Sequence, residues 1–160
     1  LNNFPACPYA RVTRLKNKLK IKVNLRTNSF FQAVERQIKI FPKEKKDLII
    51  VADPNVDDVT PYCIQYFVDT RNIALQDENL YLMCFHPGSP ATVEEHAFLA
   101  DNDWDSSKVE PYMMIFMQEL KLLQDASNQL KRQGYYKNWP MDYYNEVVTP
   151  RQKLKPNIRR

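Results

Sequence analysis

The chain has 160 residues, enough for one domain with a hydrophobic core, and 44% of them are hydrophobic. No apolar run approaches the roughly 18 residues that a membrane-spanning helix needs, so we expect no membrane partner and no secretory signal. The three cysteines, at positions 7, 63 and 84, are an odd number and cannot all form disulfides with one another. We therefore expect free thiols in a reducing compartment, by default the cytoplasm. The first residue is Leu rather than Met, so the sequence leaves open whether residues precede it.

The net charge of +4 conceals a strong segmentation along the chain. Residues 1–46 carry twelve Lys or Arg against two acids, residues 47–110 carry two against thirteen, and residues 111–160 carry nine against four. The simpler interpretation is that these blocks neutralise each other within one folded domain. The alternative is a basic face for an anionic partner such as nucleic acid, phosphate or membrane headgroups.

The first half of the chain alternates between strand and helix patterns. Apolar and polar residues alternate over 19–25, which predicts a strand with Lys20 and Lys22 on its wet face. Asn28 or Ser29 can then cap a helix that runs to about residue 40. Residues 48–52 are apolar on both faces, as expected of a central strand covered by helices.

The next elements follow the same alternation. Thr60 and Pro61 predict the N-cap and first turn of a helix to about residue 71, and residues 80–85 form another apolar strand. The chain has only two glycines and no Asn-Gly or Asp-Gly pair. Tight hairpins are therefore not expected, and longer crossovers should join the strands.

The last third is predicted to be mainly helical. Ser107 and Glu110 form a capping box that predicts the start of a helix including 112–130 and ending near Gly134. An extra strand over 143–148 stays open. We expect an α/β domain over residues 1–148, with a small three- or four-stranded mainly parallel sheet and helices on both faces. Residues 149–160 should form a basic, extended tail.

Cys7 is the first candidate for chemistry. It directly precedes Pro8, and if Pro8 opens a helix, the Cys7 sulfur faces free backbone N–H groups at the helix N-terminus. Arg11 and Arg14 follow one turn later and add positive potential. The pattern favours a thiolate that acts as a nucleophile, a redox group or a metal ligand. The alternative is a small residue that packs under the N-terminus.

His86 is the second candidate, because it follows the apolar strand 80–85 at the edge where parallel sheets hold their ligands. It could serve as the base for the Cys7 thiol, or bind a metal together with it. The alternative is a histidine satisfied by backbone groups in a turn.

An acidic stretch supplies the third candidate. His96, Asp101 and Asp103 lie close in sequence and, with His86, could assemble a mixed site for a divalent metal, the candidate cofactor. An EF-hand is excluded because position six of the loop is not Gly and position twelve is not Glu. The simpler interpretation is a solvated acidic loop.

Two resemblances involve these motifs. Cys7-Pro8-Tyr9-Ala10-Arg11 resembles the active-site turn of glutaredoxins and omega-class glutathione transferases, whose first cysteine attacks a disulfide, although only about five residues match and the preceding strand is missing. Over residues 4–90, the chain is similar to an uncharacterised bacterial family with Cys-Pro-Phe-Ala and Phe-His-Pro motifs. The matching segments are Cys7 to Ala10, with Tyr9 in place of Phe, Leu48 to Pro54, and Phe85 to Pro87. The resemblance implies a shared site with Cys7 and His86 and no known activity.

These observations lead to two functional hypotheses. The first is a small cytoplasmic enzyme acting on a small molecule or peptide, with Cys7 as nucleophile, Arg11 as anion-binding cation and His86 as general base. The second is a non-catalytic binding module that uses a basic face, including Lys18, Lys20 and Lys22, and its tail on nucleic acid or an acidic protein. The C-terminal aromatics could stack bases, but no nucleic-acid-binding motif is present. No P-loop or nucleophile elbow occurs either.

Overall fold

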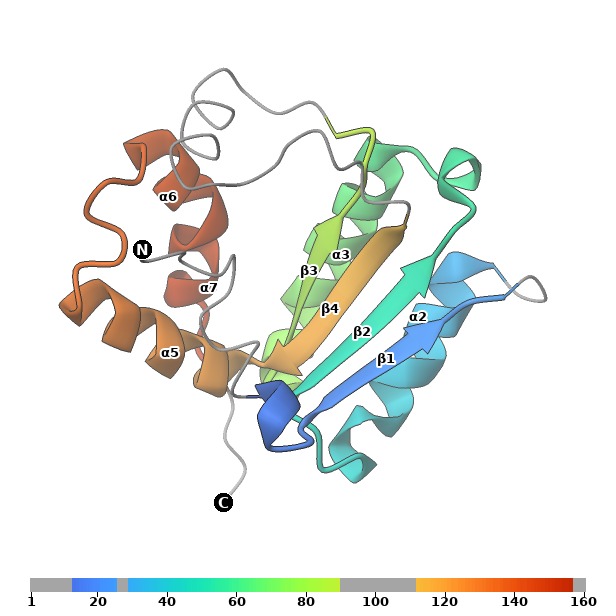
Figure 1. Ribbon diagram of the computed structural model, residues 1–160, viewed down its shortest axis with the longest axis horizontal. Coiled ribbons are helices and arrows are strands. Elements are labelled where there is room, and N and C mark those ends of the chain that lie inside the picture. The colour runs from blue at the N-terminus through green and yellow to red at the C-terminus, as the bar shows by residue number, and fades with distance from the viewer. Residues whose placement is uncertain (1–12, 26–28, 90–111, 157–160) are drawn as a thin grey trace.

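The computed structural model describes residues 13–25, 29–89 and 112–156. Its described strands form one sheet in the order β1-β2-β4-β3 (Figure 1). Their bounds are β1 Leu19–Val23, β2 Leu48–Asp53, β3 Leu80–Phe85 and β4 Met113–Glu119. β1 pairs with β2 in parallel, whereas β4 is antiparallel to both β2 and β3. The protein is therefore α/β, as predicted.

The expectation of a mainly parallel sheet is wrong, because two of its three strand pairs are antiparallel. The crossover argument itself holds, since β2 and β3 are both antiparallel to β4 and so run in the same direction as each other. What the sequence did not reveal is β4, which lies between them and separates β2 from β3. The sheet is consequently mixed.

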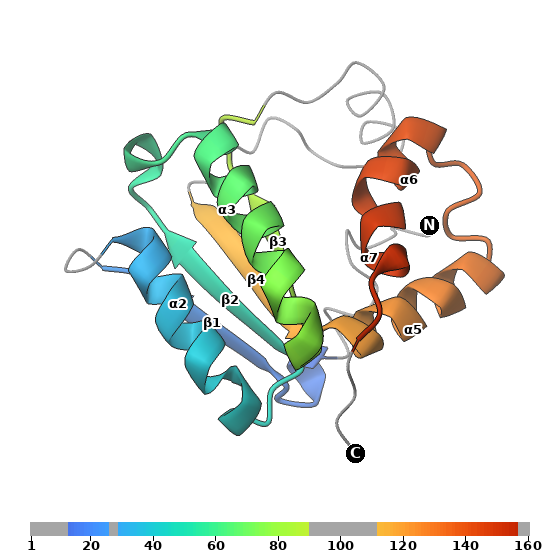
Figure 2. The same cartoon turned by 180° about the vertical axis from the view of Figure 1, so that it is seen from behind.

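Two helices cover one face of the sheet. α2 (Phe30–Ile40) and α3 (Pro61–Leu75) lie side by side on it, as the views from the two sides show (Figures 1 and 2). Both predicted caps form: the Ser29 side chain accepts a hydrogen bond from the N–H of Gln32, and the Thr60 side chain accepts one from the N–H of Cys63. The residues buried between these helices and the sheet form the main core. They include Val34, Ile38, Ile49, Val51, Ile64, Val68, Leu82, Ile115 and Met117.

Short helical segments connect these elements. Residues 13–15 are helical, and three single turns follow α2, β2 and α3: η1 (Phe41–Lys43), η2 (Val56–Asp58) and η3 (Gln76–Glu78). η1 and the residues after it lie near the start of β1, at what we call the amino end of the sheet.

Three further helices follow β4: α5 (Leu120–Arg132), α6 (Met141–Val147) and α7 (Thr149–Lys153). The side chain of Gln124 on α5 donates to the backbone oxygens of Arg151 and Leu154, at 2.6 and 2.9 Å, and so ties α5 to α7. The Arg151 guanidinium reaches the Met83 sulfur at 3.6 Å, on the sheet face opposite the core residue Leu82. Within the described residues, helices therefore reach both faces, and Arg151 of the second group contacts β3.

Two sequence-based expectations for this region are wrong, and one open alternative does not occur. Residues 113–119 form strand β4, not the first turns of a helix, and the helix begins only at Leu120. Residues 141–147 form α6 where an extra strand was left open, and residues 149–153 form α7 rather than an extended tail. The helix does end where expected, with Gly134 at a left-handed φ of 77°. Ser107 and Glu110 lie outside the described residues.

Candidate functional site

His86 is held by the loop that leads from β2 into α3. Its Nε2 lies 2.7 Å from the backbone oxygen of Val59 and 3.1 Å from that of Val56, so Nε2 carries a proton and donates it. Its Nδ1 accepts a hydrogen bond of 3.0 Å from the N–H of Gly88. The side chain is only 7% exposed. Both ring nitrogens are engaged by backbone groups, which is the arrangement of a structural histidine.

Gly88 makes this arrangement tight. A methyl group at its Cα would lie 3.2 Å from Nδ1 and 3.3 Å from Cε1 of His86, closer than ordinary van der Waals contact. A residue without a side chain at position 88 thus lets the backbone N–H approach the ring. The Phe-His-Pro motif therefore belongs to a turn after β3, and the His86 side chain binds this turn to the β2–α3 loop through hydrogen bonds.

The predicted partners of His86 cannot be placed beside it. Cys7, Arg11, His96, Asp101 and Asp103 all lie outside the described residues. Within residues 13–25, 29–89 and 112–156, no group of three or more His, Cys, Asp or Glu side chains is arranged to hold a metal ion.

The two described cysteines differ in environment. Cys84 lies on the α3 side of β3, and its sulfur is 3.2 Å from Oε1 of Gln65. Burial, assisted by the negative charge of Asp69, raises the pKa of the Cys84 thiol from 9.0 to about 11. A thiol of that pKa is protonated at neutral pH and is a poor nucleophile. Cys63 is exposed in the first turn of α3.

A buried polar cluster at the carboxyl ends of β1 and β2 was not anticipated. Asp53 is 3% exposed, and its Oδ2 accepts a hydrogen bond of 2.7 Å from the amide of Asn24. Its Oδ1 accepts from the backbone and side-chain nitrogens of Asn55, at 2.8 and 3.1 Å. In the sequence, the Asp53-Pro54-Asn55 turn pattern is the only feature that points to this cluster. Asn24 lies in the segment of alternating residues, and nothing there indicates that its amide binds Asp53. With both carboxylate oxygens occupied, Asp53 fastens the β2–α3 loop to β1.

The two faces of β1 are oriented opposite to the prediction, which placed Lys20 and Lys22 on the face turned away from the core. Lys20 and Lys22 share a face with Ile49 and Val51, the residues buried under the helices, because they are register partners in the parallel pair. Ile21 is instead 59% exposed on the opposite face. The reason is that β1 lies at the edge of the described sheet, where long lysine side chains can extend past the helix layer to water.

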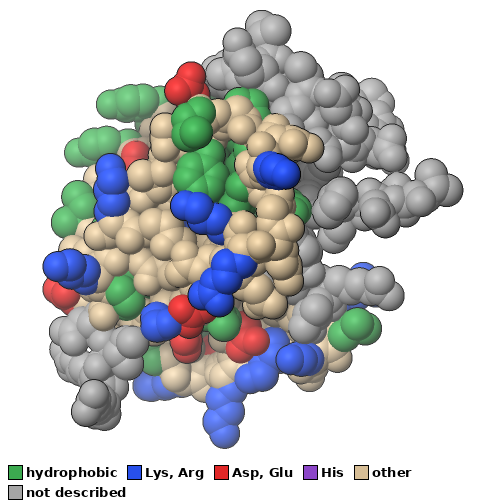
Figure 3. Space-filling model, turned by 90° about the vertical axis from the view of Figure 1, so that its left-hand side faces the viewer, with side chains coloured by type: hydrophobic (Ala, Val, Ile, Leu, Met, Phe, Trp, Pro, Cys, Tyr) green, Lys and Arg blue, Asp and Glu red, His purple; other side chains and the backbone are tan. Residues whose placement is uncertain are grey.

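Basic side chains from two distant segments meet at the amino end of the sheet. The backbone oxygen of Lys18 accepts from the N–H of Asp47 at 2.9 Å. The Lys46 amine donates to the Asn17 oxygen at 2.8 Å, and the Lys18 amine donates to the Lys45 oxygen at 3.2 Å. The space-filling view shows Lys and Arg side chains at the lower end of the molecule, with Asp and Glu side chains among them (Figure 3). We call the following residues the basic end: Arg14, Lys16, Lys18, Lys43, Lys45 and Lys46.

No family model matches this chain, and no curated protein or solved structure matches it. None of the described helices combines the length and the apolar character needed to cross a membrane.

Proposed function

We propose that this protein is a non-catalytic binding module that holds an acidic protein segment at its basic end. The observation that carries the proposal is that folding joins residues 14–18 and 43–46 into one cationic surface. Arg14, Lys16, Lys43 and Lys45 are exposed on it. Clustered charge of one sign attracts an oppositely charged partner and speeds its association.

Internal neutralisation, the simpler interpretation, receives little support from the ion pairs. Near the basic end, Glu44 is paired with Lys20 at 2.5 Å and Asp47 lies 3.8 Å from Lys18, while Glu119, at the end of β4 beside the start of β2, is exposed at the same end of the sheet. Of the described ion pairs, Lys18–Asp47 is the one that brings a base from residues 1–46 to an acid from residues 47–110. Within the described residues, the exposed bases Arg14, Lys16, Lys43 and Lys45 form no ion pair with an acid.

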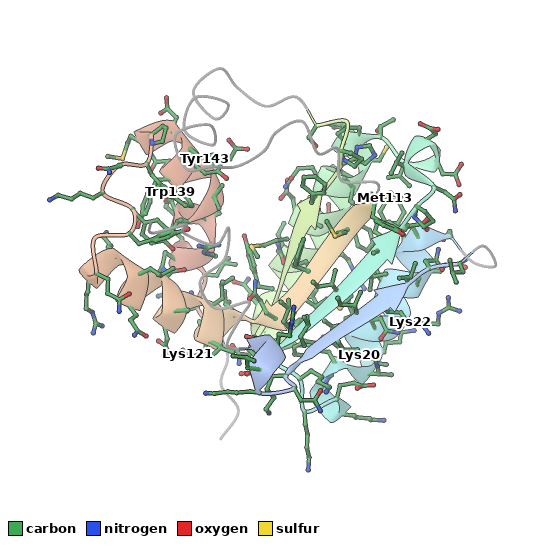
Figure 4. All side chains as sticks on the ribbon, in the orientation of Figure 1. Lys20, Lys22, Met113, Lys121, Trp139 and Tyr143 are labelled. Carbon is green, nitrogen blue, oxygen red and sulfur yellow. The ribbon has the colours of Figure 1, made fainter. Side chains whose placement is uncertain are left out.

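An acidic protein is favoured over nucleic acid by the other side chains. The C-terminal aromatics that could stack bases pack on one another instead: Tyr136 lies 5.2 Å from Tyr144 and Trp139 lies 4.9 Å from Tyr143, between ring centroids. Tyr143 on α6 and Trp139, just before that helix, lie away from β1 (Figure 4). Next to the basic end, Leu15 is 73% exposed, and an apolar surface of this kind suits a protein partner better than a phosphate backbone.

The thiol enzyme with Cys7, Arg11 and His86 stays a prediction. Two of its three residues lie outside the described part of the chain, and the third has both ring nitrogens occupied by backbone groups. A general base needs a free nitrogen within reach of the proton that it removes. The contacts of His86 therefore support the binding module more than the enzyme.

The experiment compares two charge reversals of equal size. Lys43→Glu/Lys45→Glu changes the basic end, and Arg132→Glu/Lys137→Glu changes two exposed bases at the end of α5 and in the turn that follows it. Fluorescent poly-L-glutamate is the probe, titrated at several salt concentrations. We expect binding that weakens as salt rises, because exposed charges are screened, with a loss of about tenfold or more for the first variant and less than about twofold for the second. Equal losses in the two variants, or no binding at low salt, would overturn the proposal.

A further inference from the structure

The outer edge of β1 is open in the part of the chain that the structure describes. β1 is the first strand in the order of the sheet, and no described strand pairs with its outer edge (Figure 1). Backbone groups in a parallel pair alternate between the two sides of a strand. The Lys18 oxygen and the Asn24 N–H bond toward β2, so the N–H and C=O groups of Leu19, Ile21 and Val23 point outward.

The opposite edge of the sheet is closed by a side chain. The amide of Asn72 on α3 donates to the Leu82 oxygen at 3.0 Å and accepts from the Leu82 N–H at 2.8 Å. This buried asparagine occupies the position that a further strand would take beside β3. Within the described sheet, the chain thus protects β3 and leaves β1 ready to pair.

The side chains of β1 indicate which kind of strand could pair with its outer edge. Ile21 and Val23 are 59% and 39% exposed on one face, although both are apolar. Lys20 and Lys22 lie on the other face along the sheet edge (Figure 4), and Lys22 has no side-chain partner in the described residues. An added strand that alternates acidic and apolar residues would place carboxylates beside the lysines and apolar groups beside Ile21 and Val23.

A second copy of this chain fits the edge less well. Antiparallel pairing of two β1 strands centred on Ile21 would set Lys20 of each chain opposite Lys22 of the other. Like charges directly opposite each other destabilise a strand pair, and edge lysines are a known means of preventing self-association. Lys20 is already paired with Glu44, whereas Lys22 has no acid partner among the described residues and attracts a strand that carries acids.

We infer that the β1 edge is a site for β-strand addition, and that its occupant is an extended acidic segment of another protein in which Glu or Asp alternates with apolar residues. The inference rests on the proposed function and deepens it, because the basic end lies directly before β1 and would hold the acidic residues that flank the added strand. β1 has five residues, so the paired stretch would be about 17 Å long.

The test is amide hydrogen exchange measured by NMR, with and without the blocked peptide (Glu-Val)4. We expect the Ile21 and Val23 amides, which point outward, to exchange at least about tenfold more slowly with the peptide, while the inward Lys20 and Lys22 amides change little. A control peptide with the same four Glu and two of its Val replaced by Pro should give no such protection, because Pro removes the donors of an added strand.

Each other outcome overturns the inference in a distinguishable way. A peptide that binds in a salt-dependent manner without protecting Ile21 and Val23 would remove strand addition and leave the binding module intact. No binding of peptide or of poly-L-glutamate would remove both. Protection that appears without peptide and rises with protein concentration would make a second copy the occupant. Single-stranded polyuridylate that binds while the peptide does not would replace the protein partner by nucleic acid.

Discussion

Replacing His86 by Ala tests whether this residue is structural. The substitution removes a buried ring that makes three hydrogen bonds, to the oxygens of Val56 and Val59 and from the N–H of Gly88. Each backbone group left unpaired costs about 1 kcal/mol, so the free energy of unfolding should fall by about 3 kcal/mol. For a chain of this size, that loss lowers Tm by about 6–12 °C, which thermal unfolding followed by circular dichroism will measure.

Two further variants sharpen this test. Ser89→Ala changes an exposed side chain of the same turn and should leave Tm within about 1 °C of the parent protein. Gly88→Ala should destabilise the parent protein, because the added methyl meets the imidazole at 3.2 Å, and should cost less once His86 is Ala. A His86→Ala protein that melts like the parent, or strict additivity with Gly88→Ala, would refute the structural role of the ring.

Two other expectations concern β3 and its neighbours. Asn72→Ala should lower the free energy of unfolding in urea by about 2–4 kcal/mol, because it leaves the N–H and oxygen of Leu82 unpaired. The control Ile73→Ala, on the same helix and 70% exposed, should change that free energy by less than about 0.5 kcal/mol. Equal effects of the two substitutions would contradict the edge-closing role of Asn72. Alkylation of Cys84 should show a midpoint near its pKa of about 11, well above that of an ordinary thiol, and a lower midpoint would mean that burial does not control this thiol. Because the folded state keeps the Cys84 proton up to that pH while the unfolded state loses it near 9.0, folding stability should fall between these two values and fall less in Cys84→Ala. Burial also raises the pKa of Tyr81 and acts in the same direction, so a part of the fall should remain in that variant.

The sequence predicts correctly those features that depend only on residues close together in the chain. Ser29 and Thr60 cap their helices because each side-chain oxygen accepts from an N–H three residues later, an interaction that needs no distant partner. The apolar strand over 80–85 and the helix end at Gly134 follow from composition and backbone freedom in the same way. His86 was recognised as unusual, and the alternative of a histidine satisfied by the backbone in a turn agrees with its contacts.

The sequence by itself determined the α/β class, the shared direction of β1, β2 and β3, and the starts of α2 and α3, because hydrophobic periodicity and capping act within one turn or one strand. Only the tertiary structure decided that residues 113–119 are a strand, since Met113, Ile115 and Met117 become buried by pairing between β2 and β3. The same holds for β1, whose apolar face is exposed because it lies at the edge of the described sheet. Which face of a strand is buried depends on what packs against it, and alternation alone cannot carry that information.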